Sequence, residues 1–325
     1  TQYNREFSQS EGVTLLDAAT TVGVNLPYSC KTGRCSACKC KVVSGRSVAL
    51  VDELGLTDEE KAQGFILSCV RSASSDMLIE VEDLGDQVMP EVKTLPVRIV
   101  SLERLATDVL GVKLRFPPKA KFAYLAGQYV DVIGVDGIRR SYSVANAPET
   151  GNQLQLHIRA VPGGVMSDYW FNRAEVNDLL RIKGPLGSFF ARPASSLHMV
   201  FLATGTGIAP VKAMLEQLVT VPPIDQPLSL TVYWGGRDPQ DLYAEPGQWH
   251  HELRYVPVLS RAPDDWVGVR GYVHHALLRD SPDLLNTVVY ACGSDAMIRS
   301  AKTELTRAGL PDMRFYSDSF VPSGT

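Results

Sequence analysis

The chain has 325 residues, of which 45% are hydrophobic and 21% are charged, and its formal net charge is −4. This composition is typical of globular protein, and the length predicts two or three domains. A slightly acidic chain without a basic tract argues against a nucleic-acid partner. The N-terminal residues lack an apolar signal core, and no run approaches about 18 apolar residues. We therefore expect a cytoplasmic protein that does not enter the membrane.

Three closely spaced cysteines, followed later by a fourth, are the strongest motif near the N-terminus. Cys30, Cys35, Cys38 and Cys69 follow the C-x4-C-x2-C…C spacing by which four thiolates hold a plant-type 2Fe–2S cluster. Small residues such as Gly33 leave backbone N–H groups free to donate to sulfur. A structural zinc site normally uses two C-x2-C units, whereas this chain has only one such unit, which argues against zinc. Six cysteines in a chain of this length do not resemble a disulfide framework either.

Residues 1–88 are the predicted cluster domain, and the polar, proline-bounded residues 89–96 are the predicted linker. After a short N-terminal strand, residues 14–22 are predicted to form a helix. Thr57 and Glu60 have the spacing of a capping box that opens a second short helix. Cys40 lies on an alternating strand, which predicts a buried core thiol and not a fifth ligand.

Residues 97–193 are predicted to form a small antiparallel β-barrel. Five short segments alternate apolar and polar residues and are separated by turn residues, which is the pattern of such a barrel. The predicted strands are residues 97–102, 109–116, 128–133, 139–144 and 154–161.

Within this predicted barrel, several residues have the chemistry of a flavin site. An arginine can donate two parallel hydrogen bonds to a pyrophosphate. A tyrosine can contact a flavin ring through its flat face and its hydroxyl. A glycine pair before a short helix allows close backbone approach where anions are favoured. Each feature alone has a plainer explanation, as an exposed arginine or an ordinary turn. The candidates are Arg140, Ser141, Tyr142, Ser143, His157, Arg159, Gly164, Val165, Met166 and Ser167.

Residues 194–325 change to alternating strands and helices, which predicts a parallel sheet covered on both faces. An apolar strand at residues 197–203 runs into a glycine turn, Thr204–Gly207, and then into an amphipathic helix. Such a unit is where a dinucleotide pyrophosphate binds. Pro210 stands where the third glycine of G-x-G-x-x-G belongs, so this motif alone is weak.

The order of these motifs resembles the ferredoxin–NAD(P)+ reductase family over residues 95–325. With the N-terminal segment, which resembles plant-type ferredoxins of β-grasp fold, the whole chain resembles the single-chain reductase components of multicomponent oxygenases, such as those that serve Rieske dioxygenases. It is equally similar to the CDP-6-deoxy-glucoseen reductases of deoxysugar synthesis. The resemblance implies a ferredoxin domain (1–88), an FAD-binding barrel (97–193) and an NAD-binding domain (194–325).

The resemblance also implies roles for individual residues. Arg140 would meet the FAD pyrophosphate, Tyr142 would contact the flavin and Ser143 would lie near flavin N5, whereas Ser167 would hold phosphate. Ser143 and Cys292, the latter beside the nicotinamide, are the side chains expected to tune hydride transfer. The nucleotide-side candidates are Thr204, Gly205, Thr206, Gly207, Pro210, Arg237, Cys292 and Gly293, and Phe320 is a further cofactor-binding candidate, expected near the flavin.

Plainer alternatives stay open for two of these residues. Cys292 could be a small core residue that closes a strand. Phe320 could anchor the C-terminal tail, although an aromatic residue at this place packs near the flavin in relatives. Trp234 and Trp249 are expected to serve packing.

The expected function is electron transfer from NADH through FAD and the cluster to a terminal protein. A flavin is needed because the nicotinamide gives two electrons at once and the cluster accepts one at a time. The expected partner is a Rieske-type oxygenase or a dehydrase, bound transiently by a monomer. A stand-alone diaphorase remains a rival, whereas a pure sensor would not need three cofactor motifs. Arg237, flanked by Asp238 and Asp241, favours the ribose diol of NADH over a 2′-phosphate.

Overall fold

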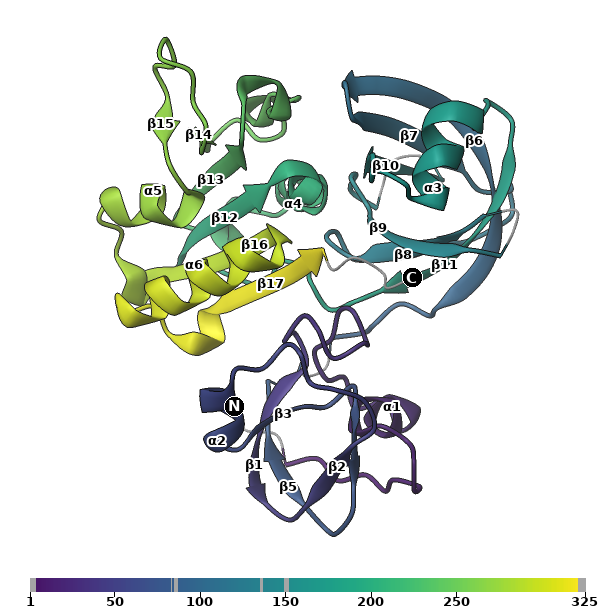
Figure 1. Cartoon of the computed structure of the whole chain (residues 1–325), viewed down its shortest axis with the longest axis vertical. Coiled ribbons are helices and arrows are strands. Elements are labelled where there is room, and N and C mark those ends of the chain that lie inside the picture. The colour runs from purple at the N-terminus through teal and green to yellow at the C-terminus, as the bar shows by residue number, and fades with distance from the viewer. Residues whose placement is uncertain (1–3, 83, 85–86, 135–136, 149–151, 321–325) are drawn as a thin grey trace. The chain divides into compact units, whose positions relative to one another are not determined.

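The protein, a computed structural model that describes residues 4–82, 84, 87–134, 137–148 and 152–320, forms two compact units. The first unit holds the N-terminal part up to Met89, together with Gly187–Phe189 and the chain around Asp318. The second unit holds most of the rest of the chain from Pro90 on, including a barrel and a parallel sheet (Figure 1). None of the helices in the described part of the chain is both long and apolar enough to cross a bilayer.

The first unit is a small mixed domain in which one helix packs against short strands. A three-stranded sheet has the order β3–β1–β5, and β2 pairs with β4. Helix α1 begins after Thr14, whose hydroxyl accepts a hydrogen bond from Asp17 N, and it buries Leu16 and Ala19 in the core. The predicted capping box is present at the start of α2. The elements are α1 (Leu15–Thr21), β1 (Lys39–Ser44), β2 (Ser47–Ala49), α2 (Asp58–Ala62), β3 (Phe65–Leu67), β4 (Arg71–Ala73) and β5 (Leu78–Glu80).

The predicted N-terminal strand is not found among residues 4–14, so this expectation is wrong for the described residues. A side chain takes the place of ladder hydrogen bonds at this edge. Gln9 accepts a hydrogen bond from Ala73 N at 3.1 Å and donates to the Ser72 hydroxyl. The backbone N–H of Ala73 in β4 is therefore satisfied by a side chain.

The barrel is a six-stranded antiparallel sheet in the order β10–β7–β6–β11–β8–β9, as the alternating pattern predicted. A bridge between Val144 and Leu156 joins its two outer strands and closes it. Its core contains fully buried residues such as Ile99 and Leu154, with Trp170 at one end. The strands are β6 (Lys93–Ala106), β7 (Val109–Arg115), β8 (Tyr129–Ile133), β9 (Arg139–Ser143), β10 (Gln153–Arg159) and β11 (Leu179–Leu186).

Two features of the barrel differ from the sequence-based expectation. Strand β6 begins at Lys93, inside the segment expected to be a linker. Pro96 is tolerated there because this stretch pairs only with β11, whereas the pairing with β7 starts at Arg98. Strand β11 was not predicted, although Leu180 and Ile182 alternate into the core.

The parallel sheet of the second unit has the order β15–β14–β13–β12–β16–β17. Strand β12 pairs in parallel with β13 along one edge and with β16 along the other. The chain therefore adds β13 on one side of β12 and later adds β16 on the opposite side. A crevice at the carboxyl ends of β12 and β16 follows from this reversal of strand order. The strands are β12 (His198–Thr204), β13 (Ser229–Gly236), β14 (Leu253–Leu259), β15 (Val269–Arg270), β16 (Thr287–Ser294) and β17 (Phe315–Phe320).

Helices cover both faces of this sheet. Helices α5 (Val273–Arg279) and α6 (Asp295–Arg307) pack on the face that carries Val200 and Leu202 of β12. The other residues of β12, which alternate with these, point to the opposite face of the sheet. Helix α4 (Ile208–Leu218) lies on that face, on the side toward the barrel (Figure 1).

Candidate active site and cofactor-binding sites

The loop from Cys30 to Cys38 is folded so that its backbone amides face sulfur. Lys31, Gly33 and Ser36 have φ values of 55°, 73° and 59°, in the left-handed region, which turns the chain sharply at each of them. Cys30 N donates to the Cys35 sulfur at 3.4 Å, and Thr32 N donates to the Cys30 sulfur at 3.3 Å. Donors of this kind stabilise thiolates and tune a cluster's potential.

The four candidate ligand thiols converge as two contacting pairs, Cys30 with Cys35 and Cys38 with Cys69. In each pair one sulfur accepts a hydrogen bond from the other, which lowers the pKa of Cys30 and of Cys69. The pKa of Cys35 and of Cys38 is raised by donating that bond and by burial. The Gly33 amide also faces the Cys69 sulfur. A Cβ at Gly33 would lie 2.7 Å from Asp52 O, so the loop fits a cluster only with glycine there. The donor set of four sulfurs ringed by amides fits a 2Fe–2S cluster.

Cys40 lies apart from these thiols. Its side chain is 2% exposed and packs with Leu15 and Ile66 in a second small core, whereas Cys38 and Cys69 belong to the core beside it. Burial raises the pKa of Cys40 to about 12. The thiol therefore behaves as a core residue, as the alternating pattern predicted.

A buried ion pair that the sequence analysis missed positions the strand leading to Cys69. Glu53 has a side chain 4% exposed, and it accepts hydrogen bonds from Arg71 at 2.6 Å and 3.0 Å. Its other oxygen accepts from Leu67 N at 2.7 Å, two residues before Cys69. The partners are far apart in sequence, so spacing alone carried no signal for this contact.

The flavin motif lies on β9, where alternation places Arg140 and Tyr142 on one face and Ser141 and Ser143 on the other. Arg140 donates to the carbonyl of Arg139 at 2.8 Å, and among the described residues no carboxylate pairs with it. Tyr142 accepts a hydrogen bond from Trp170 Nε1 at 3.1 Å, and burial raises its pKa to about 12. This aromatic edge contact holds the Tyr142 ring, and Arg140 on the same face keeps its charge available for an anion.

The glycine turn that was predicted to bind phosphate lies next to the β8–β9 hairpin. Helix α3 (Val165–Asp168) begins after Gly164, and the Ser167 hydroxyl accepts a hydrogen bond from Val161 N at 2.9 Å. The Met166 side chain is 4% exposed in the barrel core, and it would crowd a Cβ at Gly134 after β8. Only backbone groups of Met166 are thus left for a phosphate, and the first-turn amides of a helix lack intrahelical partners.

His157 and Arg159, at the end of β10, contact the nucleotide-binding part of the unit. His157 Nδ1 lies 3.1 Å from the Tyr243 hydroxyl, and burial, with a smaller effect of Lys212, lowers the His157 pKa to about 3. Arg159 pairs with Asp241 at 2.9 Å and with Asp108 at 3.3 Å. A Cβ at Gly205 would lie 3.3 Å from Arg159, so the guanidinium rests against the glycine turn.

The glycine turn after β12 and the Cys292-Gly293 segment at the end of β16 meet at the carboxyl edge of the parallel sheet. A Cβ at Gly207 would overlap the Cys292 carbonyl, and one at Gly293 would overlap the Thr204 side chain. Thr204 Oγ1 accepts a hydrogen bond from Ser294 N at 3.2 Å. Two loops that were predicted to serve one nucleotide are thus in direct contact. The Cys292 side chain itself is 0% exposed.

The glycine turn is held from behind by Trp234, which sequence analysis had assigned to packing. Trp234 is fully buried and donates from Nε1 to Gly205 O at 3.0 Å. Thr206 lies within this turn, and Pro210 lies in the first turn of α4, where proline is tolerated because no intrahelical donor is lost. The turn is therefore preorganised before any nucleotide binds.

The loop after β13 uses its acids differently from what the sequence suggested. Asp241 accepts hydrogen bonds from Arg237 N at 2.7 Å and from Arg159, and it forms a reciprocal capping box with Asp238. These contacts lower the pKa of Asp241 against the opposing effect of its burial. The Arg237 side chain is exposed. Asp241 is thus engaged in holding the loop.

Phe320, the last residue of β17, is 37% exposed.

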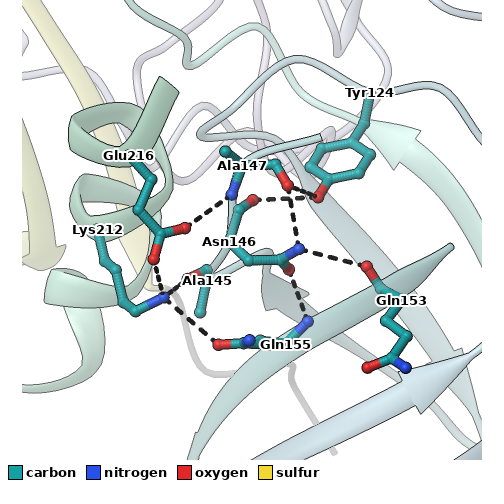
Figure 2. A network of polar contacts seen from close by, with 8 residues as sticks. All are labelled: Tyr124, Ala145, Asn146, Ala147, Gln153, Gln155, Lys212 and Glu216. Carbon is teal, nitrogen blue, oxygen red and sulfur yellow. Dashed lines mark hydrogen bonds and ion pairs between the residues drawn. The ribbon is translucent and has the colours of Figure 1, made fainter. Parts of the chain in front are cut away.

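A polar network joins α4 to the segment that follows the flavin motif (Figure 2). Lys212 Nζ donates to Ala145 O at 2.8 Å and contacts Glu216 at 2.5 Å and Gln155 Oε1 at 3.4 Å. The second oxygen of Glu216 accepts a hydrogen bond from Ala147 N at 3.0 Å. Helix α4, which begins directly after the glycine turn, is thereby hydrogen-bonded to the backbone segment that follows β9.

Buried groups fix the barrel side of this network. Asn146 is 0% exposed; it donates to Ala147 O at 3.1 Å and to Gln153 O at 3.3 Å, and it accepts from Gln155 N at 2.7 Å. Tyr124 donates to Asn146 O and Ala147 O (Figure 2). The backbone groups that Lys212 and Glu216 bind are therefore held on a rigid support. We call the contacts of Lys212 and Glu216 with residues 145–147 the α4 latch. Sequence analysis missed it, because no spacing relates these residues.

Comparison with known proteins agrees with this three-part arrangement. Residues 1–74 match the 2Fe-2S iron-sulfur cluster binding domain, residues 96–190 the oxidoreductase FAD-binding domain and residues 201–303 the oxidoreductase NAD-binding domain. The chain belongs to the family of three-domain iron–sulfur flavoprotein reductases. It is an NAD(H)- and FAD-dependent oxidoreductase with a 2Fe–2S ferredoxin domain, and its homologues are reductase components.

Three relatives show how far the similarity extends. The chain is 42% identical to the CDP-6-deoxy-L-threo-D-glycero-4-hexulose-3-dehydrase reductase of Yersinia pestis, over 98% of this chain and 96% of that protein. It is 31% identical to terephthalate 1,2-dioxygenase reductase component 2 of Comamonas sp, over 98% and 95%. Among solved structures, the Amycolatopsis cytochrome P450 reductase GcoB superposes with a TM-score of 0.75 at 31% identity, over 98% of this chain and 97% of that one.

Proposed function

We propose that this reductase passes electrons from NADH to a separate dehydrase that acts on a sugar nucleotide. The observation that carries this choice is the 42% identity, over nearly the full length of both chains, to a reductase named for such a dehydrase. The relatives named for oxygenases are 30–32% identical over similar lengths. An oxygenase as acceptor is therefore the second candidate.

When bound, the nicotinamide, flavin and cluster would supply the conversion of two-electron into one-electron chemistry. The chain's own residues bind and orient these groups. Cys30, Cys35, Cys38 and Cys69 are the proposed ligands of the cluster, which the convergence of their sulfurs supports. Lys31 and Thr32, beside Cys30, are exposed and leave one side of this loop open to a partner.

On the flavin side, the proposed roles are a charge-assisted fork from Arg140 to the FAD pyrophosphate and a ring contact from Tyr142. The face shared by these two residues, and the partner that Trp170 gives to Tyr142, support this. Ser143 and Cys292 are the proposed residues that tune hydride transfer. Ser143 is buried on β9, and Cys292 adjoins the glycine turn.

On the nucleotide side, the proposed pyrophosphate site is the preorganised turn Thr204–Gly207 with Gly293, and Arg237 is the proposed contact to the adenosine end. We propose that the reductase acts as a monomer with a transient partner. We place it in the cytoplasm, since ligand thiolates must stay reduced before cluster assembly.

The test is reoxidation of the reduced holoenzyme, followed by the absorbance of its cluster. Reduced protein is mixed without oxygen with the Yersinia dehydrase and its substrate, or with a terephthalate dioxygenase and its substrate. Saturable acceleration by the dehydrase alone would support the proposal. Acceleration by the oxygenase alone would select the second candidate, and quinones reoxidising the protein faster than either partner would indicate a diaphorase.

A further inference from the structure

Two histidines and a glutamate converge between α5 and α6, among groups to which the electron-transfer reaction assigns no role. His274 and His275 are consecutive residues near the start of α5, and Glu304 lies in the last turns of α6. His274 Nε2 is 3.4 Å from one Glu304 oxygen, and His275 Nε2 is 3.0 Å from the other. One candidate ligand atom from each residue lies within 4.8 Å of the other two.

These separations are close to those of a tetrahedral metal site. With Zn–N and Zn–O bonds of about 2.0–2.1 Å, neighbouring ligand atoms of a tetrahedral site lie about 3.3 Å apart. Each histidine–carboxylate separation, at 3.4 Å and 3.0 Å to the two different Glu304 oxygens, is near this value, and the three candidate ligand atoms lie within 4.8 Å of one another. Small side-chain adjustments would bring the three ligand atoms around one ion, and binding of the ion would displace any proton held on Nε2.

The environment of His274 also leaves its ring short of hydrogen bonds. Its side chain is 4% exposed, and its buried Nδ1 atom has no hydrogen-bond partner among the described residues. Its Nε2 atom lies 3.4 Å from Glu304. The ring stacks at 7° on Tyr272, with 6.0 Å between ring centroids, and this contact limits its rotation. Burial, and next the neighbouring His275, lower the pKa of His274.

We propose that His274, His275 and Glu304 form a binding site for a divalent transition-metal ion of the zinc class. Two imidazoles and a carboxylate are a ligand set that such ions accept, and three protein ligands leave a fourth position for water. His275 and Glu304 have side chains 46% and 35% exposed, which gives the ion a path from solvent. The bound ion would link α5 to α6 on one face of the parallel sheet. This site does not depend on the acceptor proposed above.

The chain contains a natural control for this proposal. His250, His251 and Glu252 have the same residue types, but they do not converge. The two rings lie parallel at 8° with 5.0 Å between centroids, and His251 and Glu252 are 3.8 Å apart with side chains 78% and 73% exposed. His251→Gln removes an exposed histidine without touching the proposed site.

The experiment is calorimetric titration of the holoenzyme with Zn²⁺, after a chelating resin has removed loosely bound metal and the visible spectrum has confirmed intact FAD and cluster. We expect one strong site in the wild-type protein. We expect His275→Gln and Glu304→Gln each to weaken it by at least about tenfold, since each removes one of three ligands. His251→Gln is expected to bind Zn²⁺ as the wild type does.

A second readout separates binding from misfolding of the variants. Zn²⁺ should raise the melting temperature of the wild type and of His251→Gln, because an ion that binds only the folded state stabilises it. The same addition should raise the melting temperatures of His275→Gln and Glu304→Gln by clearly less. Absence of a strong wild-type site, or equal binding by all four proteins, would overturn the proposal.

Discussion

We expect the α4 latch to make Lys212, which is far from the flavin motif in sequence, important for hydride transfer. Lys212→Met removes the ammonium group but keeps an unbranched side chain of similar length. The substitution breaks the contacts at 2.8 Å to Ala145 O and at 2.5 Å to Glu216. It leaves Glu216, whose side chain is 28% exposed, with its hydrogen bond from Ala147 N.

The magnitude follows from the burial of the pair. A hydrogen bond to a charged group contributes about 1.5–3 kcal/mol net. Lys212 is 13% exposed, so its contacts are only weakly screened, whereas the partial exposure of Glu216 lowers the cost of leaving it unpaired. We therefore expect Lys212→Met to weaken the contact between α4 and residues 145–147 by about 2–3 kcal/mol in free energy. This corresponds to a roughly 30- to 150-fold smaller equilibrium constant for that contact.

The assay is stopped-flow reduction of the flavin by saturating NADH, followed near the flavin absorbance maximum. We expect the rate constant to fall by about tenfold or more, because α4 carries the nucleotide turn and its placement sets the distance for hydride transfer. Lys119→Met, at an exposed lysine of the barrel, is the matched control. Amide exchange at residues 145–147 should also rise in Lys212→Met.

A double-mutant cycle with Glu216→Gln tests whether the two residues act together. The double variant should lose less than the sum of the two single losses, because either change alone already breaks the pair. A Lys212→Met protein with wild-type flavin reduction, wild-type amide exchange and an unchanged melting temperature would refute the reasoning.

Other predictions concern the individual cofactor sites. Cys35→Ser should abolish the visible absorption and EPR signal of the cluster while NADH still bleaches the flavin; a full cluster signal would contradict the ligand assignment. Arg140→Ala should weaken FAD retention by roughly tenfold or more, because a charge-assisted contact of about 1.5–3 kcal/mol is lost; unchanged occupancy after extensive dialysis would count against it. Glu53→Ala should destabilise the cluster domain by about 3–5 kcal/mol by leaving Arg71 without its buried partner, so the cluster absorbance should be lost at lower temperature than in the wild type. The ratio of kcat/KM for NADH over NADPH should exceed one, and a ratio below one would show that Arg237 outweighs Asp238.

Several parts of this protein could be predicted from the sequence because their determinants are local. The cluster loop depends on cysteine spacing and small residues within one stretch, and the capping box of Thr57 and Glu60 spans a single turn of helix. Alternation likewise predicted most strands of the barrel, and an apolar run predicted the strand of the parallel sheet that leads into the glycine turn. In these segments the side-chain pattern and the backbone geometry have the same period.

Other features depend on partners that only folding brings together. Strand β11 pairs with β6 across more than 80 residues, and its short pattern ends in Gly184-Pro185, which resembles a turn. The engagement of Asp241 by Arg159 changed the interpretation of the coenzyme loop, although both residues were visible as charges.

The α4 latch, the Glu53–Arg71 pair and the His274–His275–Glu304 cluster are of the same kind. Each joins side chains from separate elements, and none of the single residues differs in sequence from an ordinary surface charge or helix residue. Sequence spacing specifies which groups share a turn or a face, whereas the energy of a buried polar contact depends on distance and burial. Those two quantities are set only when strands and helices pack, so the tertiary structure alone decided which charged residues pair with one another.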